Sequence, residues 1–424
     1  YNESVIRNEE YFFSECISYN DITSGDPSLR FKSSGQIFND AGPSIFADRN
    51  TLIFLLGFGN TSVLDAYAKL LAPTIHFTVG EMASVPVVFC SESINSTIRK
   101  LVLENIELSR YDWDSFETSW DFLSHPLAQR NEKLISAQFN RWSSECQKRF
   151  YSLKSNEEEL NSIFARLYHM EGEVSIEVPN DKVSVRLADK ERDVKSLISY
   201  AVGCMFGRYS IDADGLILAD QGATVEDYLQ KVPNSTFMPD DDNVIPILDT
   251  DWFEDDIVTR FYQFLAAAYG AEALDKNVTF IEEALGKDIR SYFVKDFYKD
   301  HWHTYQKRPI YWLFQSPKKS FSCLIYMHRY TEGTAGEMLT RYLRPFEEKL
   351  RNRIDLLQTS EHAKNLKEAS KLQEKLKEIE DWERDVVYPL AHERVSIGLD
   401  DGVKVNYNKF PHALAKIPGL SDWK

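Results

Sequence analysis

Residues 307–330 read KRPIYWLFQSPKKSFSCLIYMHRY, a stretch that mixes aromatic, aliphatic and basic side chains. Two apolar runs, at 310–314 and 321–326, flank the polar segment QSPKK at 315–319. This pattern predicts a β-hairpin with a basic turn, because short apolar runs bounded by Pro and Ser are typical of paired strands. Composition by itself favours a core hairpin whose turn is solvated. A cationic hairpin with aromatic side chains is also a candidate contact with nucleic acid.

The chain has 424 residues, of which 43% are hydrophobic and 13% aromatic, and its formal net charge is −17. A chain of this length can bury a substantial core and is expected to hold roughly two to four domains. Duplex DNA repels an acidic body, so any contact with DNA has to come from local basic surfaces. The net charge by itself favours a protein partner or a small molecule.

The location of the protein is predicted from its termini, apolar runs and cysteines. The first residue is Tyr1, so we expect a fragment or a processed chain. The segment YNESVIRNEE lacks the apolar core of a signal peptide, and the longest apolar stretches, 52–58 and 197–206, are too short to span a bilayer. The five cysteines lie far apart without a CxxC pair, which favours reduced thiols. We therefore expect a soluble, cytoplasmic protein without membrane contact.

The sequence predicts a mixed α+β fold of several lobes with short sheets. Apolar residues at intervals of three and four from Leu339 to Leu357, and again from Leu366 to Val386, predict two antiparallel helices. The expected parts are an α/β lobe at 1–95, a mainly helical spacer at 96–206, an α/β lobe with the basic hairpin at 207–332, a long antiparallel helical hairpin at 333–394, and a C-terminal tail at 395–424.

Several local elements are predicted within these parts. In the first lobe we expect short strands at 35–38 and 45–46, a helix that is capped by Asn50 and ends at Gly57 or Gly59, and a second helix from Thr61. In the spacer, alternating apolar residues predict a strand hairpin at 174–187, and residues 197–206 predict a buried helix. Three tryptophans of the spacer are expected to pack between helices: Trp113, Trp120 and Trp142.

An acidic run from Asp240 to Asp256 raises the question of a divalent metal site. The run lacks the spacing and the glycine of an EF-hand, and no Asp/Glu-x-Lys pair follows it as in a nuclease. Acidic residues at a helix start are favoured by the helix dipole, so we interpret the run as the beginning of a helix and expect no metal. His301 and His303 have Trp302 between them and no nearby Cys or carboxylate pattern, so they are not interpreted as metal ligands either.

Seven segments resemble one protein family in the same order. They are FKSSGQIFNDAGPSIF at 31–46, LIFLLGFGNTSVLDAYAKLLAPTIHFTVGEMASVPV at 52–87, YDWDSFETSWDF at 111–122, ISYAVGCMFGRYSIDADGLILAD at 198–220, FMPDDDNVIPILDTDWFEDDIV at 237–258, the hairpin stretch at 307–330, and DDGVKVNYNKF at 400–410. They resemble the C-terminal part of the PglX proteins, the adenine-specific DNA methyltransferases of BREX phage-defence systems. The resemblance implies a parent that uses S-adenosylmethionine and methylates adenine N6 at a defined site. It also implies that this chain is the target-recognition and clamp half, with a target-recognition-like lobe at 1–95.

The chain lacks the two loops that such a methyltransferase needs for chemistry. Gly57-Phe58-Gly59 follows a helix-like run and precedes a cap signal at Asn60-Thr61, so it is interpreted as a helix end and not as a cofactor loop. An Asn/Asp-Pro-Pro-aromatic loop, which would hold a flipped base, is absent because the sequence contains no Pro-Pro pair. We therefore expect no catalytic residue and no cofactor in this chain, and S-adenosylmethionine only in the full-length parent.

Basic residues remain as the candidate DNA contacts, since phosphate contacts position a protein on a duplex. The candidates lie in the turn of the predicted hairpin, beside its strands, or ahead of the turn at Gly35: Arg30, Lys32, Lys307, Arg308, Lys318, Lys319 and Arg329. The expected partners are double-stranded DNA, the N-terminal methyltransferase half and other BREX proteins. Two alternatives stay open: a protein-interaction scaffold that docks defence components without touching DNA, and, with least support, a nuclease in the acidic run.

Overall fold

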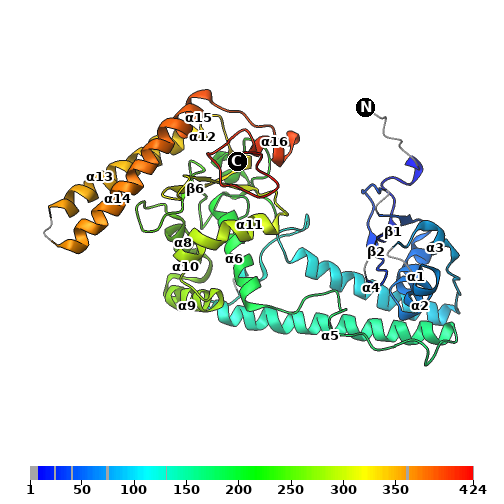
Figure 1. Ribbon diagram of the computed structural model, residues 1–424. Coiled ribbons are helices and arrows are strands. Elements are labelled where there is room, and N and C mark those ends of the chain that lie inside the picture. Colours follow the sequence, from blue (N-terminus) through cyan, green and yellow to red (C-terminus); the bar gives the residue numbers. More distant parts are fainter. Residues whose placement is uncertain are drawn as a thin grey trace. The chain divides into compact units, whose positions relative to one another are not determined.

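The computed structural model describes residues 8–22, 25–39, 42–72, 76–129, 131–359 and 362–423. The chain forms two compact units (Figure 1). Unit 1 consists of Tyr1–Trp113 and Ser143–Ala188, and unit 2 consists of Asp114–Trp142 and Asp189–Lys424. Helices hold 55% of the residues and strands hold 6%, which confirms the predicted mixed α+β class.

Unit 1 contains a small antiparallel sheet and helices around one apolar core. Its strands are β1 (Cys16–Ser18), β2 (Arg30–Lys32) and β3 (Ser44–Ile45), in the order β2-β1-β3. Its helices are α1 (Arg49–Gly59), α2 (Ser62–Leu71), α3 (Val79–Ser84), α4 (Glu92–Asp114) and α5 (Ile135–Leu167), the last of which begins in unit 2. Leu52 and Phe54 of α1 are buried in this core with Val102 of α4 and Phe164 of α5.

The local predictions in unit 1 are confirmed in part. Helix α1 ends at Gly59 and α2 begins directly after Thr61, as predicted, and β3 lies one residue before the expected strand at 45–46. The cap of α1 is Asp48 and not Asn50: the Asp48 carboxylate accepts hydrogen bonds from the first backbone N–H groups of the helix. The strand predicted at 35–38 is wrong, because Gly35 has a φ of 93° and turns the chain there.

Residues 174–187 form an extended segment with no strand, so the predicted hairpin is wrong. Val183 and Val185 are buried, and they pack with Phe150 and Leu153 of α5. Part of the alternating apolar set is therefore covered by a helix and not by a partner strand, whereas Ile176 and Leu187 are exposed.

The expectation for the three tryptophans is confirmed only for Trp142. That side chain is 3% exposed, and its indole N–H donates to the Asp193 carboxylate at 3.0 Å. Trp113 is 56% exposed and Trp120 is 97% exposed, so neither packs between helices. Trp120 lies in the turns between α4 and α5, where helical spacing does not apply, whereas Trp113 lies in the last turn of α4 on an exposed face.

Unit 2 is built around a second antiparallel sheet. Its strands are β4 (Ile245–Pro246), β5 (Tyr311–Gln315) and β6 (Ser322–Tyr326), in the order β4-β6-β5. The β5–β6 pair runs in register from Tyr311↔Tyr326 to Gln315↔Ser322, which confirms the predicted hairpin. The C-terminal tail packs back on β5, where Gln315 N–H donates to the Ala413 carbonyl at 2.9 Å.

The helices of unit 2 surround this sheet (Figure 1). Helix α6 supplies the buried helix predicted at 197–206. The full set is α6 (Lys190–Met205), α7 (Val225–Lys231), α8 (Ile257–Tyr269), α9 (Leu274–Leu285), α10 (Ile289–Tyr292), α11 (Tyr298–Thr304), α12 (Thr334–Glu337), α13 (Arg344–Gln358), α14 (Ala363–Trp382), α15 (Tyr388–Glu393) and α16 (Val403–Tyr407).

Helices α13 and α14 form the predicted antiparallel hairpin, which extends away from the sheet of unit 2 (Figure 1). Leu350 and Ile354 of α13 and Ala369 of α14 are buried along the arm. At its base, the Phe321 ring lies 5.8 Å from the Phe346 ring and 6.2 Å from that of Trp382. The arm is therefore anchored on the same hairpin that forms the centre of unit 2.

Two further expectations concern membranes and cysteines. In the part of the chain that the structure describes, no single helix combines the length and apolarity of a membrane span; α1 and α2 reach both only together, across a 76° bend. The five cysteines are free thiols, and four of them are buried: Cys16, Cys146, Cys204 and Cys323.

Candidate nucleic-acid interface

The β5–β6 hairpin forms the interior of unit 2 and not its surface. Every residue of β6 is buried, and so are the rings of Tyr311, Trp312 and Phe314 in β5. Trp312 packs edge-on against Tyr407, with the ring centroids 5.6 Å apart. The aromatic side chains of the hairpin are therefore unavailable for stacking on bases, and only its turn and its flanks reach solvent.

The turn of the hairpin presents two exposed lysines, Lys318 and Lys319. The Ser316 hydroxyl accepts hydrogen bonds from the next amides of the turn and donates to the Glu378 carboxylate of α14 at 3.0 Å. The other oxygen of Glu378 accepts from the Lys318 N–H at 2.9 Å. The backbone of the turn is thus fixed to α14, while neither lysine ammonium forms an ion pair with a described residue.

Lys307 and Arg308 lie at the other end of the hairpin, just before β5. Lys307 has a φ of 63°, and its N–H donates to the Trp302 carbonyl at 2.6 Å, which turns the chain from α11 into β5. Both side chains are exposed. Strand β5 separates them from Lys318 and Lys319, so the two basic pairs lie roughly 20 Å apart at a rise of about 3.3 Å per residue.

Arg329 is buried, in contrast to the other basic residues of the hairpin stretch, and is only 6% exposed. Its guanidinium donates to the backbone carbonyls of Asp240 at 2.8 Å and Asp241 at 3.2 Å. Burial lowers the pKa of Arg329, and the nearby Asp240 carboxylate opposes that shift. This geometry gives Arg329 a role in holding the fold, with its guanidinium directed at backbone carbonyls inside unit 2.

Arg30 and Lys32 belong to β2 in unit 1, whereas the other five candidates belong to unit 2. Arg30 is exposed and donates to the Leu29 carbonyl at 3.3 Å, and Lys32 is half-buried. Burial raises the pKa of Glu157 to about 7, and the positive charge of Arg30 opposes this rise. The positive charge of Arg30 therefore already interacts with the nearby Glu157 carboxylate.

The acidic run forms a buried network of hydrogen bonds and ion pairs. Asp240, Asp241 and Asp242 place carboxylate oxygens close enough to share a metal ion. However, an Asp242 carboxylate oxygen lies 2.9 Å from the Tyr342 hydroxyl oxygen and pairs with Arg341 at 2.9 Å. Burial raises the pKa of Asp240, and the adjacent Asp242 carboxylate raises it further. Donors of the protein thus already contact Asp242, whereas the Asp241 carboxylate is exposed and lies 3.6 Å from Arg341.

The two aspartates that a nuclease would need also have structural roles. Asp256 is fully buried, caps α8 and pairs with Arg290, whose two nitrogens lie 2.9 and 3.1 Å from its oxygens. Asp255 accepts from the Tyr342 hydroxyl at 2.6 Å. The run thus begins a helix, as the sequence predicted, and additionally neutralises buried arginines, for which the sequence gave no signal.

His301 and His303 do not converge on one site. They lie on α11 and not on a strand; His301 is buried, whereas His303 is exposed. The Nε2 atom of His301 accepts two backbone hydrogen bonds at 3.2 Å, from Ile310 and Tyr311. Burial lowers the pKa of His301 to about 3, so the ring is neutral and acts as a backbone acceptor.

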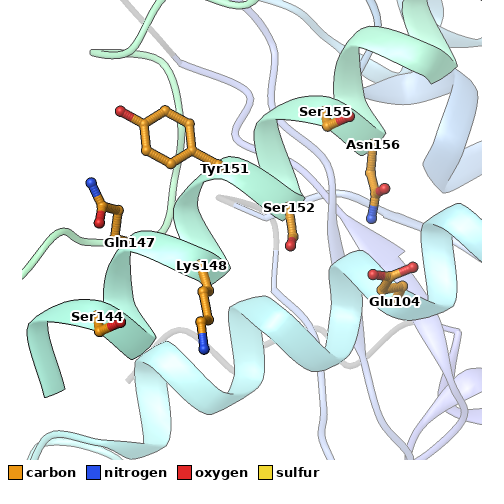
Figure 2. A pocket seen from close by; sticks show the side chains of 8 residues that line it. All are labelled: Glu104, Ser144, Gln147, Lys148, Tyr151, Ser152, Ser155 and Asn156. Carbon is orange, nitrogen blue, oxygen red and sulfur yellow. The ribbon is translucent and has the colours of Figure 1, made fainter. Parts of the chain in front are cut away.

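A polar groove of about 720 Å³ lies between α4 and α5 in unit 1 (Figure 2). Lys148 and Ser152 project from α5 toward α4, on which Glu104 lies (Figure 2). The other lining residues are mostly small polar ones: Ser144, Gln147, Tyr151, Ser155 and Asn156. The sequence did not predict this groove, because its α5 residues form one polar helix face and polar periodicity does not show which other helix lies against it. The groove offers hydrogen-bonding groups without the charge density of a phosphate site.

Comparison with known proteins finds two adenine-specific methyltransferases to which nearly all of the chain is similar. No protein-family model matches it. It is 38% identical over 427 residues to the adenine-specific methyltransferase PglX of Lacticaseibacillus casei (strain Zhang), a match that covers 95% of the chain and 35% of that protein. It is 30% identical over 461 residues to the adenine-specific methyltransferase BrxX of Escherichia coli O9:H4 (strain HS), covering 99% of the chain and 38% of that protein. Over nearly all of its length the chain is therefore homologous to the PglX-like adenine-specific methyltransferases, and it spans a little over a third of the curated relatives it matches.

Proposed function

We propose that this chain is the C-terminal target-recognition and clamp region of a PglX-like DNA adenine-N6 methyltransferase that acts in BREX phage defence in the cytoplasm. The observation that carries the proposal is the 38% and 30% identity to PglX and BrxX along 95% and 99% of the chain. In this proposal the remaining two thirds of such a protein bind S-adenosylmethionine and methylate the flipped adenine, while this chain holds the duplex.

The Gly57-Phe58-Gly59 segment does not have the form of an S-adenosylmethionine loop. Gly57 and Gly59 lie inside α1, where a Cβ would come within 2.8 Å of Val102 and 2.1 Å of Leu29. The two glycines therefore allow close packing of α1 against its neighbours, and this segment is not an open loop. The proposal accordingly assigns this chain binding and positioning of DNA, with no step of the methyl transfer.

The grip on DNA is proposed to come from four exposed cations around the β5–β6 hairpin, Lys307, Arg308, Lys318 and Lys319, together with Arg30 and Lys32 in unit 1. The chain has a net charge of −17, so most of its surface repels phosphate. A duplex is therefore expected to bind only at such local basic surfaces. A scaffold that docks other BREX proteins is the second candidate. It is favoured by the net charge of −17 and by the exposed α13–α14 arm.

Reversing the charges of the hairpin turn, with Lys318→Glu and Lys319→Glu together, is expected to weaken binding of the chain to a duplex. Loss of two phosphate contacts should reduce the log–log salt slope by about 1.8 and the affinity at 0.1 M salt on the order of tens of fold. Fluorescence anisotropy with a labelled duplex measures both quantities.

The matched control reverses two other exposed lysines of unit 2, Lys295 and Lys299, and changes the net charge by the same amount. Equal loss of affinity in both variants would attribute the effect to net charge and remove the turn from the interface. Retention of wild-type binding by the turn variant would also remove the turn from the interface, whereas absence of binding by the wild-type chain would favour the scaffold.

A further inference from the structure

One face of α14 carries a row of lysines. At 100° per residue, Lys364, Lys367 and Lys371 fall within an arc of about 60° on the helix surface. Glu378 falls inside the same arc, roughly 20 Å further along the helix from Lys364 at a rise of about 1.5 Å per residue. All three lysines are exposed.

At the base of the arm, this face of α14 contacts the β5–β6 turn through Glu378. Its carboxylate accepts from the Ser316 hydroxyl at 3.0 Å and from the Lys318 N–H at 2.9 Å, so the β5–β6 turn lies against this face. The exposed Lys318 and Lys319 therefore continue the line of the three α14 lysines. We call these five residues the lysine row: Lys318, Lys319, Lys364, Lys367 and Lys371.

The lysine row differs from three arginines of α13 in having no ion-pair partner among the described residues. Along α13, Arg344 pairs with Glu383 at 2.9 Å, Arg351 with Glu380 at 2.7 Å, and Arg353 with Glu368 at 3.2 Å. None of the five lysines of the row forms such a pair with a described residue. The five lysines outnumber the nearby Glu374 and Glu378. This surface is therefore net positive, although the net charge of the whole chain is −17.

We propose that the lysine row is a surface that follows the phosphates of one strand of duplex DNA, so that the α13–α14 arm acts as the clamp. This proposal rests on the DNA-binding function proposed above and names further residues that perform it. A row about 20 Å long faces roughly six phosphates per strand, since phosphates of one strand recur every 3.4 Å along the duplex axis.

The composition of the row indicates contact with the backbone and not with bases. Its members are lysines on a rigid helix and a fixed turn, and they are not interleaved with aromatic side chains that would stack on unpaired bases. Lysine acts as a point charge toward phosphate, whereas sequence is specified through base edges. Binding through the row should therefore be equally strong for unrelated duplex sequences.

The test compares the full chain with the triple variant Lys364→Glu, Lys367→Glu and Lys371→Glu on two labelled 30-base-pair duplexes of unrelated sequence, across a salt series. The expected result is a salt slope reduced by about 2.7 on both duplexes, with the helical circular dichroism of the chain unchanged. The matched control reverses Lys276, Lys295 and Lys299, which are exposed on other elements of unit 2, and should leave the slope close to that of the wild type.

The outcomes separate the two proposals. If the wild-type chain binds and the triple variant keeps its slope, the lysine row is not part of the interface, while the DNA-binding function stands. Equal losses in the triple variant and the control would overturn the row as well, because net charge alone would explain them. If the wild-type chain does not bind either duplex at low salt, the function and the row are both overturned.

Discussion

Replacing Arg329 by methionine is expected to destabilise unit 2 by about 3–5 kcal/mol, the range found when one partner of a buried charge network is removed. The guanidinium donates to the carbonyls of Asp240 and Asp241 at 2.8 and 3.2 Å and reaches the Phe206 carbonyl at 3.4 Å. Methionine fills part of the volume but satisfies none of these acceptors. It also leaves the buried carboxylate of Asp240 without its nearest positive charge.

Hydrogen exchange of the β6 amides, measured by mass spectrometry on the full chain, reports the free energy of opening of unit 2. The control is Arg353→Met, which removes an ion pair with Glu368 whose side chains are 45% and 44% exposed and which should change that free energy by less than about 1 kcal/mol. Equal protection of β6 in the two variants would show that Arg329 does not hold the interior together. It would then return as a candidate for contact with DNA.

Replacing Arg290 by alanine is expected to destabilise unit 2 by a similar amount, about 3–5 kcal/mol at pH 8. The change leaves Asp256, which is fully buried, as an uncompensated carboxylate at the start of α8. It also removes the donor that Arg290 gives to the Leu248 carbonyl at 2.8 Å. The free energy of unfolding from urea titrations measures the loss.

The destabilisation by Arg290→Ala should depend on pH. Burial already raises the pKa of Asp256 in the native chain, while the ion pair with Arg290 opposes that rise. Without Arg290 the folded-state pKa rises further. A carboxyl with a raised folded-state pKa contributes most stability below its unfolded pKa and loses that contribution as pH rises. The defect should thus be smaller at pH 5 than at pH 8, and the double variant with Asp256→Asn should recover stability at pH 8; a defect independent of pH would contradict this.

Much of the fold could be predicted from local patterns. The β5–β6 hairpin, the end of α1 at Gly59 and the α13–α14 arm follow from apolar periodicity and turn residues, which act within a few positions of the chain. The failures share a different cause. Residues 174–187 alternate like a strand but pack on α5, and Trp120 lies in a turn where helical spacing does not apply. Tertiary packing decides such positions, and it is not encoded in their immediate neighbours.

The candidate interface could be predicted less completely for the same reason. Lys318 and Lys319 were found because turn composition implies exposure, which the structure shows for both. The buried Arg329 binds the carbonyls of Asp240 and Asp241, which lie more than 80 residues away in the chain. A local sequence pattern therefore does not predict its burial. The α14 lysines recur at the same helical spacing as the apolar seam. A search for charged periodicity on that helix, in addition to apolar periodicity, would have found them.

The most direct test of the proposed function is duplex DNA binding by the unmodified chain across a salt series. About six phosphate contacts predict an observed association constant that falls with salt along a log–log slope near −5, and measurable binding at low salt. Absence of binding to any duplex at low salt would contradict the proposal and favour a scaffold that meets other proteins through its acidic surface.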